Sequence, residues 1–484
     1  MHEEGGEEVA EAPKAALING MWHETRQRLR VEDPASGALL AEVSDAGEAQ
    51  AHAAVDAAAG AGAHWAGTAP RTRSELLARV FEAMQAACEP LARLIVQENG
   101  KTLADARGEV AYAAEFFRWF SEEGVRARGM HLRAPKGGGD LLTFKEPVGV
   151  SVLITPWNFP AAMAARKLAP ALAAGCTTVL KPASATPLTA LALAKILQDC
   201  GAPPGVVNVL PSSAAGALSQ ALLSRPEVRK LSFTGSTEVG RGLLALAGQR
   251  VINCSMELGG DAALLVFDDA DLDLAVEQSL IAKMRNGGQA CTSANRLYVQ
   301  AGVFEAFLER LRARMQALRM GPGLEPGTQL GPLISQSAQG AMGQVVAAAL
   351  GRGAELVTGG AAPDRPGYFF APTVLAGRGE RELVDGEVFG PIAPVMRFVA
   401  EAEAVRRANA VAFGLVAYVF TGDLQRGLRV ARALQAGMVA INKGLVSDPA
   451  APFGGVKQSG LGREGGAEGL EAFLETKYVA ADLG

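Results

Sequence analysis

A strict alternation of short apolar runs and helical patterns occupies the chain between Val148 and Met256. The five apolar runs cover Val150 to Ile154, Thr177 to Leu180, Val206 to Leu210, Leu231 to Thr234 and Val251 to Ser255. The four segments between them carry helical spacing of apolar residues. Five strands joined by four helical crossovers predict a parallel, doubly wound α/β sheet, whose ligands bind beyond the carboxyl ends of the strands.

A second α/β pattern begins after Asp261, and its length supports a second domain. Its strands are expected near residues 262–267, 296–300, 392–398, 416–420 and 438–441, with helices between them. A chain of 484 residues exceeds what one hydrophobic core usually supports, which agrees with more than one domain. A site at the interface between the two domains is therefore expected.

The remaining segments complete the predicted organisation. Short apolar stretches at residues 16–22 and 27–43 suggest a small β arm, and residues 46–125 have helical spacing. Residues 130–147 and the C-terminal segment Phe473 to Val479 look like extended strands with no obvious core of their own, and they are expected to pair with another element such as another subunit. The predicted boundaries are residues 1–14 for a disordered tail, 15–128 and 148–260 for a dinucleotide-binding domain, 261–465 for a catalytic domain, and 129–147 and 466–484 for β oligomerisation segments.

Composition and charge argue against several classes of protein. The net charge of -5 and the pI near 5.8 leave no basic surplus for phosphates, so nucleic acid is not an expected partner. No apolar run approaches the roughly 18 residues that a membrane span needs. The five cysteines are scattered and the N-terminus is acidic, which predicts a cytoplasmic protein without disulfides. All five histidines precede the motifs described next, so neither a metal centre nor a Cys-His dyad is expected.

One cysteine, Cys291, has the sequence context of an exposed functional loop. It follows the Gly287-Gly288 pair, which comes after an amphipathic run over residues 271–285. A thiol there could be a nucleophile, because a modest local field brings its ionisation near neutral pH; the alternative is a small buried apolar residue. The base would have to be a carboxylate, and Glu257, at the end of the last strand of the first sheet, is the best placed candidate unless it is a surface glutamate.

Two features at the strand ends suggest anion binding. Thr234-Gly235-Ser236 ends a strand and begins a helix, which offers free amides and the positive end of a helix dipole to a phosphate. The stretch lacks the glycine fingerprint of a standard dinucleotide turn, so an ordinary glycine turn is the alternative. Lys181, at the end of the second strand, supplies a cation at the same edge unless it is a surface lysine.

Taken together and in this order, six motifs resemble the aldehyde dehydrogenase superfamily over about residues 17–480. They are Thr155-Pro156-Trp157-Asn158-Phe159-Pro160, Lys181-Pro182, Phe233-Thr234-Gly235-Ser236, Met256-Glu257-Leu258-Gly259-Gly260, Gly288-Gln289-Ala290-Cys291 and Glu387-Val388-Phe389-Gly390-Pro391. The resemblance implies that the Cys291 thiolate attacks an aldehyde carbon and that the Asn158 amide and the Cys291 N-H hold the oxyanion. It also implies that Glu257 activates the water that hydrolyses the resulting thioester.

The same resemblance implies a nicotinamide cofactor. Glu387 and Phe389 would position the nicotinamide riboside, and Leu258 would approach the nicotinamide. Many NAD-preferring relatives carry a glutamate two residues after the Lys-Pro pair, where this chain has Ser184, so NADP is expected to be preferred, with NAD possible. The implied cofactor-binding residues are Thr155, Pro156, Trp157, Lys181, Ala183, Ser184, Gly235, Ser236, Leu258, Glu387 and Phe389.

Within the superfamily, the chain resembles the succinate-semialdehyde dehydrogenases in particular. The residues that carry this resemblance are Arg166, Arg285 and Ser447, which in that subfamily hold the substrate carboxylate. The alternative is that the two arginines form interdomain ion pairs. Glutarate- and 2-oxoglutarate-semialdehyde dehydrogenases use related pockets, so the length of the substrate stays open. A homodimer or homotetramer is expected.

Two departures and two competing functions accompany the resemblance. Ser293 stands where some members of the subfamily carry a second cysteine that switches the nucleophile by disulfide formation, and Asp261 stands where asparagine or lysine is common. A non-catalytic scaffold of the same fold would be expected to have lost Asn158, Glu257 or Cys291, and all three are present. An acylating dehydrogenase, which passes the thioester to coenzyme A, is disfavoured by the retention of Glu257.

Overall fold

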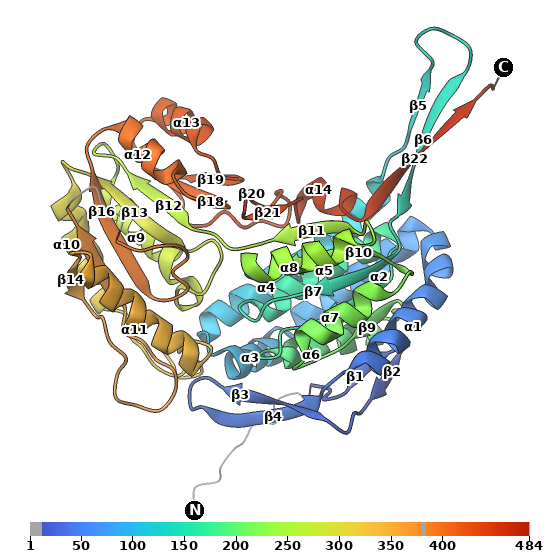
Figure 1. Cartoon of the computed structure of the whole chain (residues 1–484), viewed down its shortest axis with the longest axis horizontal. Helices are drawn as coiled ribbons and strands as arrows, with labels where there is room; N and C mark the ends of the chain where they lie inside the picture. Colours follow the sequence, from blue (N-terminus) through green and yellow to red (C-terminus); the bar gives the residue numbers. More distant parts are fainter. Residues whose placement is uncertain (1–11, 379–382, 484) are drawn as a thin grey trace, which may run out of the picture.

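Two twisted sheets, each covered by helices, form two lobes that face each other, and a long three-stranded arm extends from one of them (Figure 1). The computed structural model describes residues 12–378 and 383–483, so most of the tail expected over residues 1–14 lies outside the described residues. Within these two ranges, none of the helices combines the length and the hydropathy of a membrane span.

The first sheet contains the five parallel strands that the sequence predicts. They are β7 (Val150–Ile154), β8 (Thr178–Lys181), β9 (Val207–Val209), β10 (Val228–Thr234) and β11 (Asn253–Glu257). Their order in the sheet is β9-β8-β7-β10-β11, so the direction of winding reverses between β7 and β10. Every residue of β7, β8 and β9 is buried, as expected for a sheet covered on both faces. The reversal marks the edge where a ligand should bind.

The four crossover helices are α5 (Pro160–Ala174), α6 (Pro187–Asp199), α7 (Ala215–Ser224) and α8 (Thr237–Gly248). The helical region upstream folds as α1 (Glu48–Gly67), α2 (Pro70–Ala86), α3 (Cys88–Asn99) and α4 (Leu103–Glu123), followed by the short η1 (Gly124–Arg126). Helices α2 to α6 share one hydrophobic core on one face of the sheet, and α1, α7 and α8 cover the other face. The lobe therefore has three layers.

The small β arm expected at residues 16–43 is only partly separate. β1 (Ala16–Ile18) pairs antiparallel with β9, and β2 (Met21–His23) follows it, so both strands extend the edge of the first sheet. β3 (Arg28–Asp33) and β4 (Ala38–Ser44) form the independent hairpin. At the opposite edge, β21 (Gly460–Leu461) pairs with β11.

The second sheet has seven strands in the order β14-β15-β16-β13-β12-β18-β19. The five expected strands are present as β12 (Ala262–Val266), β13 (Ala294–Gln300), β16 (Ile392–Phe398), β18 (Val416–Phe420) and β19 (Met438–Ile441). Two strands that the sequence did not predict, β14 (Glu355–Thr358) and β15 (Thr373–Gly377), extend its edge. The surrounding elements are α9 (Leu272–Met284), η2 (Arg285–Gly288), α10 (Phe304–Gln316), α11 (Gln336–Gly351), α12 (Glu401–Asn409), α13 (Leu424–Ala433) and the small strands β17 (Phe413–Gly414) and β20 (Val456–Lys457).

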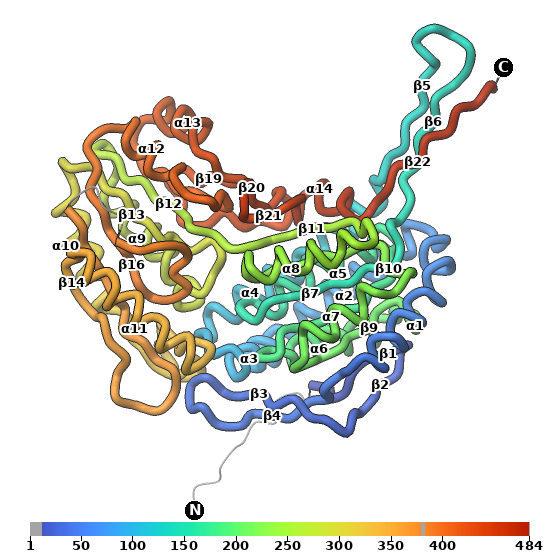
Figure 2. Tube along the Cα trace, in the orientation of Figure 1, coloured from blue at the N-terminus to red at the C-terminus, as the bar shows by residue number. Residues whose placement is uncertain are grey.

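The strands without a core of their own pair with one another. β6 (Asp140–Pro147) pairs with β5 (Met130–Arg133) on one side and with β22 (Leu474–Ala481) on the other. The short α14 (Gly466–Glu471) leads into β22. The trace in Figure 2 shows this arm extending well beyond the lobe that carries it, with the C-terminal strand alongside the β5-β6 hairpin.

Candidate active site

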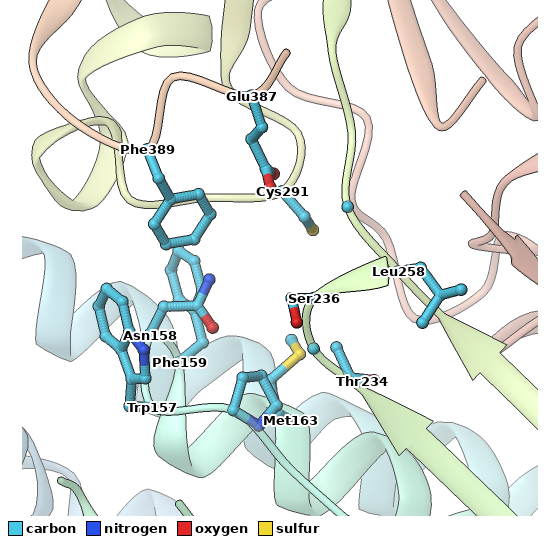
Figure 3. Close-up of a pocket in the computed structure, with 13 residues that line it drawn as sticks. Trp157, Asn158, Phe159, Met163, Thr234, Ser236, Leu258, Cys291, Glu387 and Phe389 are labelled. Atoms are coloured by element: carbon cyan, nitrogen blue, oxygen red, sulfur yellow. The ribbon is translucent and has the colours of Figure 1, made fainter. Parts of the chain in front are cut away.

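A pocket of about 230 Å³ lies at the carboxyl ends of β7, β10 and β11, where the winding of the first sheet reverses. Figure 3 shows the sulfur of Cys291 pointing into this pocket from the opposite lobe, toward Asn158 and Ser236. Many of the residues implied by the sequence meet here, namely Pro156, Trp157, Asn158, Gly235, Ser236, Leu258, Cys291, Glu387 and Phe389. Thr155, Lys181, Ala183, Ser184 and Glu257 are absent from the lining.

The loop that carries Cys291 depends on an unusual backbone. Asn286, Gly287 and Gly288 have φ of 51°, 64° and 76°, the left-handed region that glycine tolerates best. A Cβ at Gly288 would lie 2.1 Å from the carbonyl oxygen of Gly390, so no other residue fits there. The sequence predicted an exposed loop, but residues 286–290 are buried between the lobes and Cys291 is half-buried. The expectation failed because the first lobe packs over the loop, where Asn158 contacts Asn286 and Gln289.

The thiol of Cys291 is held in its neutral form. Burial raises its pKa to about 12, and the nearby guanidinium groups of Arg166 and Arg285 only partly oppose this effect. Among the described residues, its Sγ has no hydrogen bond. A reaction at this sulfur therefore needs a group that removes the proton as the new bond forms.

Asn158 is fixed by contacts from both lobes. Its Nδ2 donates to the carbonyl oxygen of Gln289, two residues before the cysteine, at 3.0 Å. The backbone carbonyl oxygen of Asn158 accepts from Lys101 Nζ at 2.7 Å and from Asn286 Nδ2 at 2.9 Å. The amide has a second N-H proton and lies in the pocket beside Cys291, so it can donate to an oxygen bound there.

Behind Asn158 lies a buried ion pair that the sequence analysis missed. Lys101 and Glu109 contact each other with both side chains fully buried. Glu109 also accepts from the backbone N-H groups of Ala161 and Ala162, at 2.8 and 3.2 Å, and so satisfies the first turn of α5. The detectable signal was a pair of charged residues on the core-facing side of a helical pattern, which is costly unless the charges are paired.

Glu257 ends β11, and its carboxylate is close enough to Cys291 to raise the pKa of the thiol. An ideal Cβ on Gly454 would be 2.8 Å from Glu257 Oε1, so the carboxylate lies beside Gly454, and Glu257 is not among the residues that line the pocket. Neither of its oxygens has a hydrogen bond to the described part of the chain. Burial and the nearby carboxylate of Glu464 raise its pKa well above the ordinary value, although Arg166 and Lys167 oppose this. The structure therefore places a proton-holding group near the nucleophile, without direct contact.

A second, smaller cavity adjoins the first and shares Cys291, Phe159 and Met163 with it. We call it the anion chamber, and its other lining residues are Tyr112, Arg166, Arg285, Ala290, Thr292, Ser447 and Phe453. All three residues implied for substrate binding are among them. The guanidinium of Arg285 lies over Phe159, 4.6 Å from the ring centroid, and has no ion pair or hydrogen bond with any residue in the described ranges.

Arg166 has two kinds of contact in the anion chamber. Its Nε lies 3.0 Å from Glu464 Oε2, so Arg166 forms an ion pair with a residue that closely follows β21, the edge strand of the first sheet. Its guanidinium also stacks on Phe453 at 4.0 Å, and its buried Nη2 has no hydrogen-bond partner among the residues described. A buried guanidinium N-H without a partner is costly, which favours an anion as its missing partner.

Residues on the opposite side of the first pocket suit a nucleotide. Glu387 accepts from the N-H of Gly260 at 3.2 Å, and burial raises its pKa to about 7. The ring of Phe389 packs edge-on against Trp157, with centroids 5.5 Å apart. Ser236 caps α8 through its Oγ, which accepts from the N-H of Val239, so the positive end of this helix faces the pocket.

Lys181 lies farther along the same edge, at the end of β8. It is only 5% exposed, and no ion pair or hydrogen bond of its side chain occurs within the described ranges. Burial lowers its pKa to about 8, with a small opposing effect from Asp45. Ala183 and Ser184, which follow it, are half-buried. A buried cation without a counter-charge fits the phosphate or ribose of a nucleotide, so these residues agree with the implied cofactor.

The structure explains the unusual Asp261. Its carboxylate lies 3.1 Å from Arg296 Nε, and Arg296 Nη2 donates to the carbonyl oxygen of Asp261 at 2.7 Å. Both side chains are buried, so each charge needs the other. The acidic residue is therefore matched by an arginine on the neighbouring strand β13, and it also contributes to the raised pKa of Glu387.

A doubly wound sheet whose ligand edge faces a cysteine on a second lobe defines a class of enzyme, the nucleotide-dependent oxidoreductases that work through a thiol. Within this class the assignment is specific. Residues 22–479 match the aldehyde dehydrogenase family, and the chain belongs to that family.

Individual relatives extend over nearly the whole chain. A succinate-semialdehyde dehydrogenase of Paenarthrobacter nicotinovorans is 52% identical over 442 residues, which cover 91% of this chain and 98% of the relative. A glutarate-semialdehyde dehydrogenase of Pseudomonas aeruginosa is 47% identical and covers 96% of each chain. The crystal structure of an NADP-dependent enzyme of E. coli is similar with a TM-score of 0.95 and 48% identity, and covers 97% of this chain and 98% of that chain.

Proposed function

We propose that this aldehyde dehydrogenase oxidises an aldehyde with a terminal carboxylate, succinate semialdehyde to succinate, and prefers NADP. The observation that carries the proposal is the anion chamber beside Cys291. There, the guanidinium of Arg285 and the Nη2 of Arg166 have no hydrogen-bond or ion-pair partner in the described part of the chain. The relatives that act on succinate and glutarate semialdehydes support it, and glutarate semialdehyde is the second candidate substrate.

The chemistry begins at the sulfur of Cys291. The aldehyde carbon binds next to Sγ, with the substrate carboxylate in the anion chamber. The sulfur attacks the carbonyl carbon as its proton leaves to the Glu257 carboxylate, directly or through water, after the Glu257 side chain rotates into the pocket. The oxygen of the thiohemiacetal accepts from Asn158 Nδ2 and from the Cys291 N-H, which stabilise the developing charge.

NADP, when bound, supplies the hydride acceptor that turns the thiohemiacetal into a thioester. Lys181 and Ser184 would hold its adenosine end, and Glu387, Phe389 and Trp157 its nicotinamide end. Glu257 then takes a proton from the water that attacks the thioester carbon. The carbon-sulfur bond breaks, the carboxylate product leaves, and the thiol of Cys291 is restored by a proton.

The choice between water and coenzyme A as the thioester acceptor can be tested on the parent protein. Glu257 beside the pocket supports water, because transfer to a thiol does not need a base for hydrolysis. Formation of NADPH from succinate semialdehyde, glutarate semialdehyde and butanal, with and without coenzyme A, separates these alternatives and ranks the substrates.

Cofactor preference gives one expected result. Ser184→Glu should shift the preference from NADP toward NAD, because a carboxylate repels the 2′-phosphate and accepts from the 2′-hydroxyl. Loss of a hydrogen bond to a charged group is worth about 1.5 to 3 kcal/mol, so KM for NADP should rise about ten- to hundredfold. Steady-state kinetics with both cofactors measure this shift. The cofactor proposal would be contradicted if the parent enzyme used NAD better than NADP and if Ser184→Glu had the same ratio of kcat/KM for the two cofactors.

Arg285 gives the sharpest test of the substrate proposal. Arg285→Ala should lower kcat/KM for succinate semialdehyde about ten- to hundredfold, mainly through KM, because a charged hydrogen bond is lost in ground and transition states alike. Butanal, which has no carboxylate, should lose little. Arg285 is preferable to Arg166 here, since removal of Arg166 would also leave Glu464 without one of its partners.

A matched control removes an arginine elsewhere. Arg429 forms a surface ion pair with Glu401, 2.8 Å apart, and Arg429→Ala should leave the ratio of the two aldehydes unchanged. If Arg285→Ala slows both aldehydes equally, Arg285 has a structural role and the substrate proposal is wrong.

The exposed arm supports a homo-oligomer, which we propose as a homodimer or homotetramer. Met130, Leu132, Phe144 and Tyr478 on its strands are 42–59% exposed, which is unusual for large apolar side chains that cluster on one element. All five cysteines are free thiols, which supports a reducing cytoplasmic compartment.

A further inference from the structure

Tyr112, on α4, has a buried hydroxyl without a well-formed hydrogen bond to the described part of the chain. Its ring lines the anion chamber and packs edge-on against Phe116, with centroids 4.9 Å apart. Its Oη is shielded from solvent and makes no hydrogen bond of normal geometry in the described part of the chain, and the side chain of Ser447 lies close enough to lower its pKa. Buried tyrosine hydroxyls normally find a partner, because desolvating one without compensation is costly. The unmet hydroxyl indicates a ligand group in the chamber.

The surroundings of Tyr112 identify the chemistry of that ligand. Arg285 lies 6.0 Å from its ring centroid, and Arg166 and Ser447 line the same chamber. Burial raises the pKa of Tyr112, so the phenol stays neutral and can donate its proton at ordinary pH. Among the described residues, those that line the chamber include two cations and three hydroxyl groups, those of Tyr112, Thr292 and Ser447, and no carboxylate. A carboxylate, with about four acceptor positions on two oxygens, matches this set.

We propose that Tyr112 is a specificity-determining residue that donates a hydrogen bond from Oη to the terminal carboxylate of the substrate. This inference rests on the proposed function and assigns a new residue to it. Tyr112 favours the charged substrate in two ways. It contributes a bond to the carboxylate, and it penalises an aldehyde without one, because the hydroxyl then stays buried and unpaired.

Tyr112→Phe tests the assignment, because it removes the hydroxyl and keeps the ring against Phe116. We expect kcat/KM for succinate semialdehyde to fall about ten- to hundredfold, mainly through KM, while butanal changes less than about twofold. With butanal as the substrate, succinate should inhibit the parent competitively, and its inhibition constant should rise by a similar factor in Tyr112→Phe. This second measurement reports carboxylate binding without any turnover of the charged aldehyde.

A matched control removes another buried tyrosine hydroxyl. Tyr418 donates to the carbonyl oxygen of Thr292 at 2.7 Å and does not line the anion chamber. Tyr418→Phe should lower Tm and leave the preference between the two aldehydes unchanged. Tyr112→Phe should change the preference between the aldehydes and leave Tm unchanged or raised, because it deletes a hydroxyl without a well-formed hydrogen bond in the described part of the chain.

The outcomes separate this inference from the proposed function. A parent enzyme without a preference for succinate semialdehyde over butanal would refute the proposed function, and the role of Tyr112 with it. If the parent has that preference, and Tyr112→Phe keeps both the preference and the inhibition constant for succinate, only the role of Tyr112 is refuted. A fall in Tm equal to that of Tyr418→Phe with unchanged preference would assign Tyr112 to the core.

Discussion

Cys291→Ala is expected to abolish aldehyde oxidation, with a loss of kcat on the order of 10⁴-fold or more, because no other group can form the covalent intermediate. The fold should survive the change. The Sγ has no hydrogen bond within the described residues, and the backbone of the loop depends on Asn286, Gly287 and Gly288 rather than on the thiol. Tm and cofactor binding, measured by fluorescence titration, should therefore remain near the parent values.

Cys200→Ala is the matched control, since it removes a half-buried thiol at the end of α6, far along the chain from the pocket. It should retain the parent rate. Residual oxidation by Cys291→Ala at more than about a hundredth of the parent rate would mean that another nucleophile or water acts directly, and the proposed covalent route would be wrong.

Glu257→Gln is expected to give a burst of NADPH close to one equivalent per active site, followed by turnover slower by about 10²- to 10⁴-fold. The burst survives because hydride transfer precedes hydrolysis, but it should form more slowly than in the parent, because water must then take the proton of Cys291 in place of Glu257. Stopped-flow absorbance at the NADPH band resolves the two phases. The raised pKa of Glu257 adds a pH signature. Only the carboxylate form of Glu257 accepts a proton, so the turnover rate of the parent should rise with pH through that pKa. In Glu257→Gln the turnover rate should no longer rise over this pH range.

Glu98 offers a control for the loss of a buried carboxylate. Its side chain is fully buried at the N-terminus of α6, where it accepts from the N-H groups of Leu188 and Thr189 at 2.8 and 2.9 Å. Burial raises its pKa to about 7. Glu98→Gln should lower Tm without producing a burst. If Glu257→Gln turns over as fast as the parent in the steady state, Glu257 is not the base.

The fold was predictable where the local pattern and the tertiary structure agree. The strands β7, β8 and β9 are buried along their whole length and separated by helices, so their short, mostly apolar runs are easily distinguished. β15 was missed because it is a short apolar run that follows a segment dense in proline and glycine, where periodicity cannot separate strand from loop. β14 lies at the edge of its sheet and is largely exposed, so it carries no hydrophobic pattern.

Prediction of the site was limited for a different reason. Motifs with a fixed order located Cys291 and Asn158, but Tyr112 lies within the helical pattern of residues 103–123, where an aromatic residue cannot be distinguished from a core residue. Only the structure places it beside Arg285 in the anion chamber. The orientation of Glu257 was equally hidden, because a side-chain rotamer depends on neighbours such as Gly454 and Glu464 that are distant in the sequence.

The hydrogen bond from Asn158 Nδ2 to the Gln289 carbonyl has a consequence for motion of the two lobes. Asn158 belongs to the first lobe and Gln289 to the loop that carries the nucleophile. This hydrogen bond therefore fixes the position of the amide relative to the sulfur across the boundary between the lobes. Asn286 Nδ2, which donates to the Asn158 carbonyl oxygen at 2.9 Å, adds a second tie over the same boundary. Rocking of one lobe against the other must break both ties or carry the two reacting groups along together. If both hydrogen bonds persist when the cleft opens, the Asn158 amide and the Cys291 sulfur keep their relative geometry while the nucleotide enters or leaves.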